Sequence, residues 1–158
     1  MTTGYVIGLN HAYNYFERAS IPSGFDQLPS FTHLNLSNTC FSGQIPWEFS
    51  RLTRLVSLDL STTINYYDFN RCNGHLKLER PNLKELIQNL TSLMELYLDG
   101  VDLSTQGSDH WSQVLSQSLP NFRALSLSRC CLPGSIHSSF SQLAFLSHLQ
   151  LDENNLSG

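Results

Sequence analysis

Charged residues are scarce in this chain of 158 residues: they make up 14% of it, and only two of them are lysines. The formal net charge is −4, and the nine Lys and Arg residues are spread thinly along the sequence. Proteins that bind nucleic acid or an anionic membrane surface normally carry a basic patch. The composition therefore predicts neither of these partners. Disorder is disfavoured too, because 41% of the residues are hydrophobic.

Long apolar runs and cysteines are also few. No segment approaches the roughly 20 apolar residues of a membrane-spanning helix, so we expect no membrane insertion by this segment. The first residues have neither the basic nor the apolar region of a secretory signal peptide, and we expect the chain to lack one. Cys40, Cys72, Cys130 and Cys131 are too few for a disulfide scaffold and show no zinc or redox spacing. The sequence leaves open whether Cys72 is paired.

Residue types used in catalysis occur without catalytic spacing. Ser108, Asp109 and His110 are consecutive, and three adjacent residues cannot place a nucleophile, a base and an orienting acid in line. The six histidines show no metal-ligand spacing, and no glycine-rich phosphate loop is present. We therefore expect no enzyme activity, no metal and no cofactor.

Leucine dominates instead: there are 27 leucines, many of them in a recurring frame. The frame reads apolar-x-x-Leu-x-Leu and starts near residues 6, 31, 55, 93, 122 and 146. The intervals between successive frames are 25, 24, 38, 29 and 24 residues. Three of them are therefore nearly equal, and the other two are longer. We interpret residues 1–158 as one solenoid segment of about six repeats, with insertions at 65–80 and 104–119.

The alternation inside each frame predicts a short strand with one buried face. We expect Leu34, Leu58, Leu96 and Leu125 to point into a shared interior, from strands that run side by side in parallel. Apolar residues at helical spacing predict short helices within 83–90 and 111–119. Asn154 follows the last frame, and we expect its side chain to bond the backbone of the next coil.

The turns that follow the strands carry a second signature. Residues 42–46 read Ser-Gly-Gln-Ile-Pro, and residues 133–136 read Pro-Gly-Ser-Ile. Together with the leucine frame, they make the chain resemble the plant-type leucine-rich repeat. More narrowly, segments 34–38, 41–46, 95–101 and 106–107 resemble plant receptor-like proteins of disease resistance, most similar to the Verticillium wilt resistance type.

This resemblance implies a fold. The expected class is an α/β solenoid with a parallel concave β-sheet and an irregular or short-helical convex side, here uncapped. Receptors of this family carry a signal peptide, terminal caps, more repeats and one transmembrane helix. We therefore expect the chain to be a truncated fragment of such a receptor.

The resemblance also implies a function. It is non-catalytic recognition by part of the ectodomain of a plant cell-surface receptor-like protein, in pathogen recognition and defence signalling. The parent receptor would lie on the extracellular face of the plasma membrane, with a peptide or protein ligand and a partner receptor kinase. Two alternatives stay open: a secreted inhibitor of the polygalacturonase-inhibiting type, and a non-functional truncated product.

Outward-facing strand positions of a solenoid line one continuous concave face. The candidate ligand-binding residues at or beside these positions are His33, Asn35, Asp59, Glu95, Tyr97, Asp99, Arg123, Arg129, His148, Gln150 and Asp152. Acids of the middle repeats precede arginines of the fifth, which predicts alternating charge suited to a polar peptide or a protein surface; a solvated face whose charges serve solubility is the alternative that stays open. Strands about 4.8 Å apart give a face of about 400 Å². This is half of the roughly 800 Å² that each partner of a standard interface contributes.

Three Asn-x-Ser/Thr tripeptides are candidate N-glycosylation sites, at Asn35, Asn89 and Asn155. Asn89 is favoured because it lies off the apolar stripe of its predicted helix. The repeat itself is rich in Asn-Leu-Ser, so such tripeptides also arise by chance, and this alternative stays open.

Overall fold

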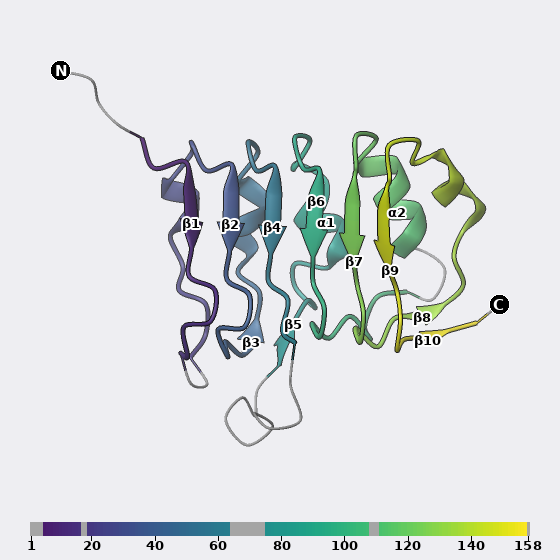
Figure 1. Ribbon diagram of the computed structural model, residues 1–158, viewed down its shortest axis with the longest axis horizontal. Coiled ribbons are helices and arrows are strands. Elements are labelled where there is room, and N and C mark those ends of the chain that lie inside the picture. Colours follow the sequence, from purple (N-terminus) through teal and green to yellow (C-terminus); the bar gives the residue numbers. More distant parts are fainter. Residues whose placement is uncertain (1–4, 17–18, 64–74, 108–110, 158) are drawn as a thin grey trace.

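The computed structural model describes residues 5–16, 19–63, 75–107 and 111–157. Six short strands lie side by side in chain order and form one parallel sheet (Figure 1): β1 (Gly8–Asn10), β2 (His33–Asn35), β4 (Ser57–Asp59), β6 (Glu95–Tyr97), β7 (Ala124–Ser126) and β9 (His148–Gln150). Parallel neighbours need a crossover between each pair of strands. Since each crossover returns behind the same sheet, the chain winds as a solenoid.

The middle residue of every strand is a leucine, and these leucines pair with one another in register: Leu9, Leu34, Leu58, Leu96, Leu125 and Leu149. The four inner ones are at most 1% exposed, whereas the last is 43% exposed on the outermost strand of this sheet. The predicted shared interior and parallel pairing are therefore confirmed.

Each coil carries one short helical element behind the sheet (Figure 1): η1 (Phe25–Gln27), η2 (Trp47–Arg51), α1 (Leu83–Ile87), α2 (Trp111–Ser118) and η3 (Ser138–Gln142). Each element packs against the next along the solenoid. The two α-helices occur in the two longest coils, within the predicted segments. Coils of 24 or 25 residues have room only for a 3₁₀ turn, which is tighter and shorter.

The first α-helix begins with a capping box. The Asn82 side chain accepts a hydrogen bond from the Glu85 backbone N–H, and the Glu85 carboxylate accepts one from the Asn82 N–H, both at 2.9 Å. These two bonds satisfy amide groups that a helix start leaves unpaired. The Asn-x-x-Glu spacing is a sequence signal for this start, and the expectation above, based on apolar spacing, did not use it.

Two further pairs of very short parallel strands were not predicted. β3 (Gly43–Gln44) pairs with β5 (Leu76–Lys77), and β8 (Pro133–Gly134) pairs with β10 (Asn155–Leu156). They join the turn regions that follow the main strands in neighbouring coils. Two-residue strands have no hydrophobic alternation, so periodicity could not reveal them.

Backbone hydrogen bonds also link the turn after each strand to the same turn of the next coil. The Asn38 N–H donates to the Ser61 carbonyl at 2.8 Å, and the Gly100 N–H donates to the Ser128 carbonyl at 2.9 Å. In the following coil, the Arg129 N–H donates to the Asp152 carbonyl at 3.0 Å. Asn38, Gly100 and Arg129 all have a positive φ, between 53° and 76°. The left-handed conformation at this turn position is thus adopted by an asparagine, a glycine and an arginine in these three coils.

The direction of the Asn154 hydrogen bonds corrects one expectation. Its Oδ1 accepts bonds from the N–H groups of Cys130 and Leu132 at 2.9 and 3.1 Å, and its Nδ2 donates to the Leu127 carbonyl at 2.7 Å. All three partners belong to the preceding coil and not to the next one, because the unpaired groups of that turn face Asn154. The Cys130 thiol, at the same repeat position, likewise lies 3.1 Å from the carbonyl oxygen of Leu98 in its own preceding coil.

The cysteines are in different states. Cys40 is disulfide-bonded, and Cys130 and Cys131 are free thiols. Burial raises the pKa of the Cys130 thiol. The question of whether Cys72 is paired lies outside the described residues, as do positions 65–74 of the first predicted insertion and the candidate triad at 108–110.

Replacing Gly100 with alanine should strain the turn ladder. Gly100 has φ +76°, and an added Cβ would lie 2.8 Å from the Thr62 backbone oxygen. We expect Gly100→Ala to lower the free energy of unfolding by about 2–4 kcal/mol, from backbone strain and overpacking together. Gly24→Ala is the matched control, because Gly24 also has a positive φ but its Cβ would meet only the Gln27 side chain, at an ordinary contact distance of 3.8 Å. It should cost about 1 kcal/mol. Urea unfolding followed by circular dichroism measures both, and equal losses would contradict the close approach at Thr62.

Candidate functional site

A groove of about 470 Å³ lies on the concave side of β1, β2, β4 and β6. We call it the concave groove and define it by its polar and aromatic lining residues: Asn10, His33, Asn35, Ser57, Asp59, Glu95 and Tyr97. These side chains flank the buried leucines, so the two-residue period of a strand turns them outward. Five of the eleven predicted binding residues line it. Asn10 and Ser57 also do so, and the same alternation would have found them.

Two carboxylates and a phenol come together in the concave groove. Asp59 on β4 is in register with Tyr97 on β6, and Glu95 on β6 is in register with Ser57 on β4. Partial burial, followed by the negative charges of Glu95 and Asp59, raises the pKa of Tyr97. Both carboxylates therefore act on the same phenol. Neither forms a salt bridge with a basic residue in the part of the chain that the structure describes.

The groove residues next to the turns are held in place by local hydrogen bonds. Asp59 Oδ1 accepts bonds from the Ser61 N–H at 3.0 Å and the Ser61 hydroxyl at 2.6 Å. In the coil that precedes that of Asp59, Asn35 Oδ1 accepts a bond from the N–H of Ser37, two residues further along the same turn, at 2.9 Å. One oxygen of each side chain thus caps a turn, and the geometry of the groove is fixed before any ligand arrives.

The other half of the concave face, over β7 and β9, is different. Ala124 and Ser126 are small and buried there. The Ser126 hydroxyl lies 2.6 Å from Asp99 Oδ1 and 2.9 Å from Gln150 Oε1. The Ser128 N–H donates to Asp99 at 2.7 Å. These acceptors therefore bond serines of their own chain.

Asp152 belongs to the same serine network. It accepts a hydrogen bond from the Ser128 hydroxyl, which lowers the pKa of the Asp152 carboxyl. His148 on β9 is exposed and lies outside this network. The predicted candidates on this half are thus divided between structural acceptors and a free surface residue.

The two predicted arginines flank β7, and neither forms a salt bridge in the described residues. Arg123 is exposed just before β7, and Arg129 lies in the left-handed turn just after it. Within the described ranges, the salt bridges are Arg51–Asp26 and Lys77–Glu79, both at 3.1 Å. In these ranges the acids of the concave groove and the two arginines therefore form no ion pair with one another, although the arginines belong to the coil next to Glu95 and Tyr97.

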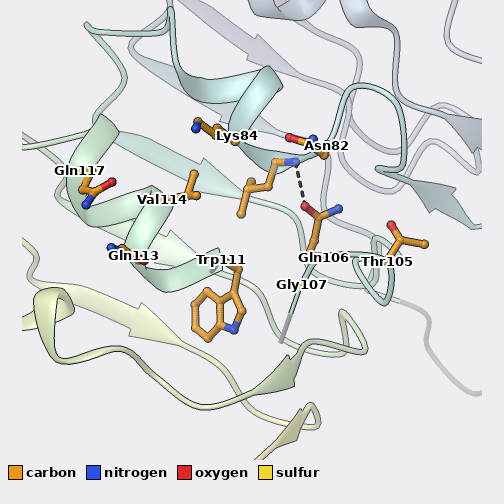
Figure 2. Close-up of a pocket in the computed structure, with 10 residues that line it drawn as sticks. Asn82, Lys84, Thr105, Gln106, Gly107, Trp111, Gln113, Val114 and Gln117 are labelled. Atoms are coloured by element: carbon orange, nitrogen blue, oxygen red, sulfur yellow. Dashed lines mark hydrogen bonds between the residues drawn. The ribbon is translucent and has the colours of Figure 1, made fainter. Parts of the chain in front are cut away.

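A second cavity, of about 330 Å³, lies on the convex side between α1 and α2 (Figure 2). Figure 2 shows Gln106 directed toward the start of α1, with Trp111 approaching from α2. Gln106 is buried, and its Oε1 accepts a bond from the Leu83 N–H at 3.0 Å while its Nε2 donates to the Leu78 carbonyl at 2.6 Å. Gln106 is thus a structural link. No buried side-chain N or O atom in the described residues lacks a hydrogen-bond partner, so nothing in this cavity indicates a ligand.

The described residues contain neither a metal-ligand cluster nor a membrane-spanning helix. Among the residues placed by the structure, no three His, Cys, Asp or Glu side chains gather as a metal site. No helix in those same ranges has the length and apolar character needed to cross a bilayer.

The three glycosylation candidates have different surroundings. Asn89 is exposed and lies in the turn after α1, since that helix ends at Ile87 rather than continuing through Asn89 as expected. Asn155 is exposed on β10, whereas Asn35 is half-buried in the concave groove. Glycosylation itself stays a prediction at all three positions.

The pKa of Tyr97 tests the electrostatics of the concave groove. Removing one negative charge with Glu95→Gln should make the phenolate easier to form, and should move the pKa of Tyr97 down toward the ordinary value for tyrosine. The ring carbon shift of ¹³C-labelled tyrosine, followed by NMR against pH, measures this change, and Tyr97→Phe identifies the signal. Glu48→Gln removes the same charge on the convex side and should leave the pKa unchanged. An unmoved pKa in Glu95→Gln would contradict the convergence of these groups.

Comparison with known proteins places the chain in a family. The Leucine Rich Repeat family model matches residues 30–52. The chain is 35% identical over 152 residues to Receptor-like protein 6 of Arabidopsis thaliana, and 32% identical over 157 residues to Receptor-like protein EIX1 of Solanum lycopersicum. These matches cover 95% and 97% of this chain but only 14% of each relative. The chain therefore spans about one seventh of the length of these relatives.

Solved structures agree with the sequence match. The crystal structure of a TDR receptor superposes with a TM-score of 0.67 at 27% identity, over 96% of this chain and 27% of that one. The Arabidopsis receptor kinase HAESA, solved in complex with the peptide hormone IDA and the co-receptor SERK1, gives a TM-score of 0.58 at 25% identity, over 94% of this chain and 26% of that one. The narrower resemblance to the Verticillium wilt resistance type stays a prediction. By its leucine frame, its coil architecture and these relatives, the chain is a leucine-rich-repeat solenoid segment that is similar to plant receptor-like proteins.

Proposed function

We propose that this chain is a non-catalytic recognition module whose concave face binds a peptide or protein ligand. The observation that carries the proposal is the concave groove, an open site built by outward side chains from four successive coils. The structural relative HAESA, solved with a peptide hormone, supports this choice of ligand class.

The concave groove is preorganised for binding. The outward residues of the groove sit on strands whose alternate residues are buried leucines, so their positions change little when a ligand binds. Asp59 and Asn35 are also fixed by turn-capping bonds. A surface ordered in advance loses less entropy on binding than a flexible one.

The size of the face limits what this segment does alone. About 400 Å² is half of the surface that one partner of a standard interface contributes. In a protein as long as the relatives, the ligand would contact other coils as well. Of the eleven predicted residues, we assign direct ligand contact to the five that line the concave groove. The other six would lie at the periphery of the ligand: Asp99, Arg123, Arg129, His148, Gln150 and Asp152.

The cellular setting follows from the family. We place the parent protein on the extracellular face of the plasma membrane, in pathogen recognition and defence signalling, with a partner receptor kinase that carries the signal. The name of the HAESA complex, which includes a co-receptor, supports a partner of this kind. An N-glycan at exposed Asn89 is compatible with this setting. A glycan at Asn35 would instead occupy the groove, so the two proposed roles of Asn35 exclude each other.

Selection from a displayed library of random peptides tests the proposed function. Peptides selected on the 158-residue chain should bind Tyr97→Ala at least 10-fold more weakly, since this change removes the aromatic wall of the groove; tenfold equals about 1.4 kcal/mol. Trp47→Ala is the matched control, because Trp47 is half exposed on the convex side. Its affinity, measured by calorimetry, should stay within twofold. Peptides that depend on Trp47 and not on Tyr97 would contradict a concave binding site.

A further inference from the structure

We propose that the concave groove selects a basic side chain, lysine or arginine, of the ligand, and holds it between the Asp59 and Glu95 carboxylates and the ring of Tyr97. This inference rests on the proposed function, because it specifies the chemistry of the ligand at the same site.

The arrangement of the two carboxylates is the first reason. Asp59 and Glu95 lie on neighbouring strands, and each faces a neutral residue across the ladder: Tyr97 faces Asp59, and Ser57 faces Glu95. Adjacent strands are about 4.8 Å apart and alternate residues of one strand about 6.6 Å, so the two acids are diagonal neighbours. One cation placed between such neighbours can reach both carboxylates, and the planar fork of arginine suits this geometry especially well.

The lack of a counter-charge is the second reason. Neither carboxylate has a salt-bridge partner in the described residues, and Asp59 Oδ2 has no hydrogen-bond partner there. His33 is the one basic side chain among the groove residues, and its Nδ1 lies 2.9 Å from the hydroxyl of its neighbour Thr32. Two like charges held close together repel each other. A bound cation would relieve this repulsion, whereas an anionic side chain would add to it.

The aromatic wall is the third reason. Tyr97 is partly exposed, lines the groove and feels both carboxylates, so all three groups face a common space. A cation near the face of a tyrosine ring gains about 0.5–1 kcal/mol or more at a partly exposed site. The site thus offers a cation both ionic and aromatic contacts.

The rest of the concave face restricts the preference to this place. Asp99 and Asp152 are also acidic, but each accepts hydrogen bonds from serines of its own chain. Arg123 is exposed just before β7, in the coil between those of Asp99 and Asp152. A peptide with one basic residue would therefore be oriented with that residue over β4 and β6.

Three short peptides test the inference. They are acetylated and amidated pentapeptides, Gly-Ser-X-Ser-Gly, with arginine, its neutral isostere citrulline, or glutamate at X. In an NMR titration of the ¹⁵N-labelled 158-residue chain, the arginine peptide should shift amide signals of β4 and β6. It should bind at least fivefold more tightly than the citrulline peptide, and the glutamate peptide more weakly than both.

Charge-removing variants assign the preference to the two acids. Asp59→Asn keeps the acceptor oxygen that caps Ser61, and Glu95→Gln keeps the size of the side chain, so the turn and fold are preserved. Each change should reduce the preference for arginine over citrulline, and the double variant should abolish it. Glu48→Gln, on the convex side, should leave it intact.

The outcomes separate this inference from the proposed function. Equal affinities for the three peptides, with shifts on the concave strands, would overturn the inference and leave peptide recognition standing. A preference that survives in the double variant would overturn the role of Asp59 and Glu95. No shift on the concave strands with any peptide would also overturn the inference, while the library selection decides the proposed function independently.

Discussion

Stacking of leucines between successive coils is the interaction on which every other feature of this molecule depends. A single coil is too thin to bury Leu34 or Leu58 by itself, and both are buried because coils lie on either side. Each fully buried leucine contributes about 1.5–3 kcal/mol relative to an exposed one. The same stacking fixes the strands in register, and the strand period then sends the alternate side chains to one open face. The recognition surface is thus a geometric consequence of the core.

Residues of one type do different work on that face, according to their neighbours. Asp99 lies beside the fifth coil, where Ser126 and Ser128 both donate to it, so its charge stabilises the backbone of that coil. Asp59 uses one oxygen for its own turn and leaves the other toward the groove, where Glu95 adds a second negative charge. Small residues on β7 separate the two environments. The concave face therefore has two parts: an acidic groove over β1, β2, β4 and β6, and a part over β7 and β9 whose acceptors bond serines of the same chain. The two parts differ although all the repeats follow the same leucine frame.

The sequence was sufficient for features that follow from local period and spacing. The Leu-x-Leu frames predicted the six strands and the buried ladder, and apolar spacing predicted both α-helices. Features that depend on partners more than 20 residues away could not be predicted in the same way. Gln106 bonds Leu78 and Leu83 across such a separation, and Ser126 meets Asp99 and Gln150. Alternating charge along the face was expected from sequence order, but sequence order does not determine which charges pair, and the described residues contain no ion pair between the arginines and the acids of the face.

Native-state hydrogen exchange in a variant of the leucine ladder tests the central claim most directly. Leu58 is fully buried in the middle of the ladder, so Leu58→Ala should lower the free energy of unfolding by about 2–5 kcal/mol. Amide protection should fall in β2 and β6 as well as in β4, because the neighbouring coils lose their shared contact. Leu149→Ala, at a position 43% exposed, should cost less than about 1 kcal/mol. Loss of protection confined to β4, or equal losses at Leu58 and Leu149, would contradict a fold held together by stacked leucines.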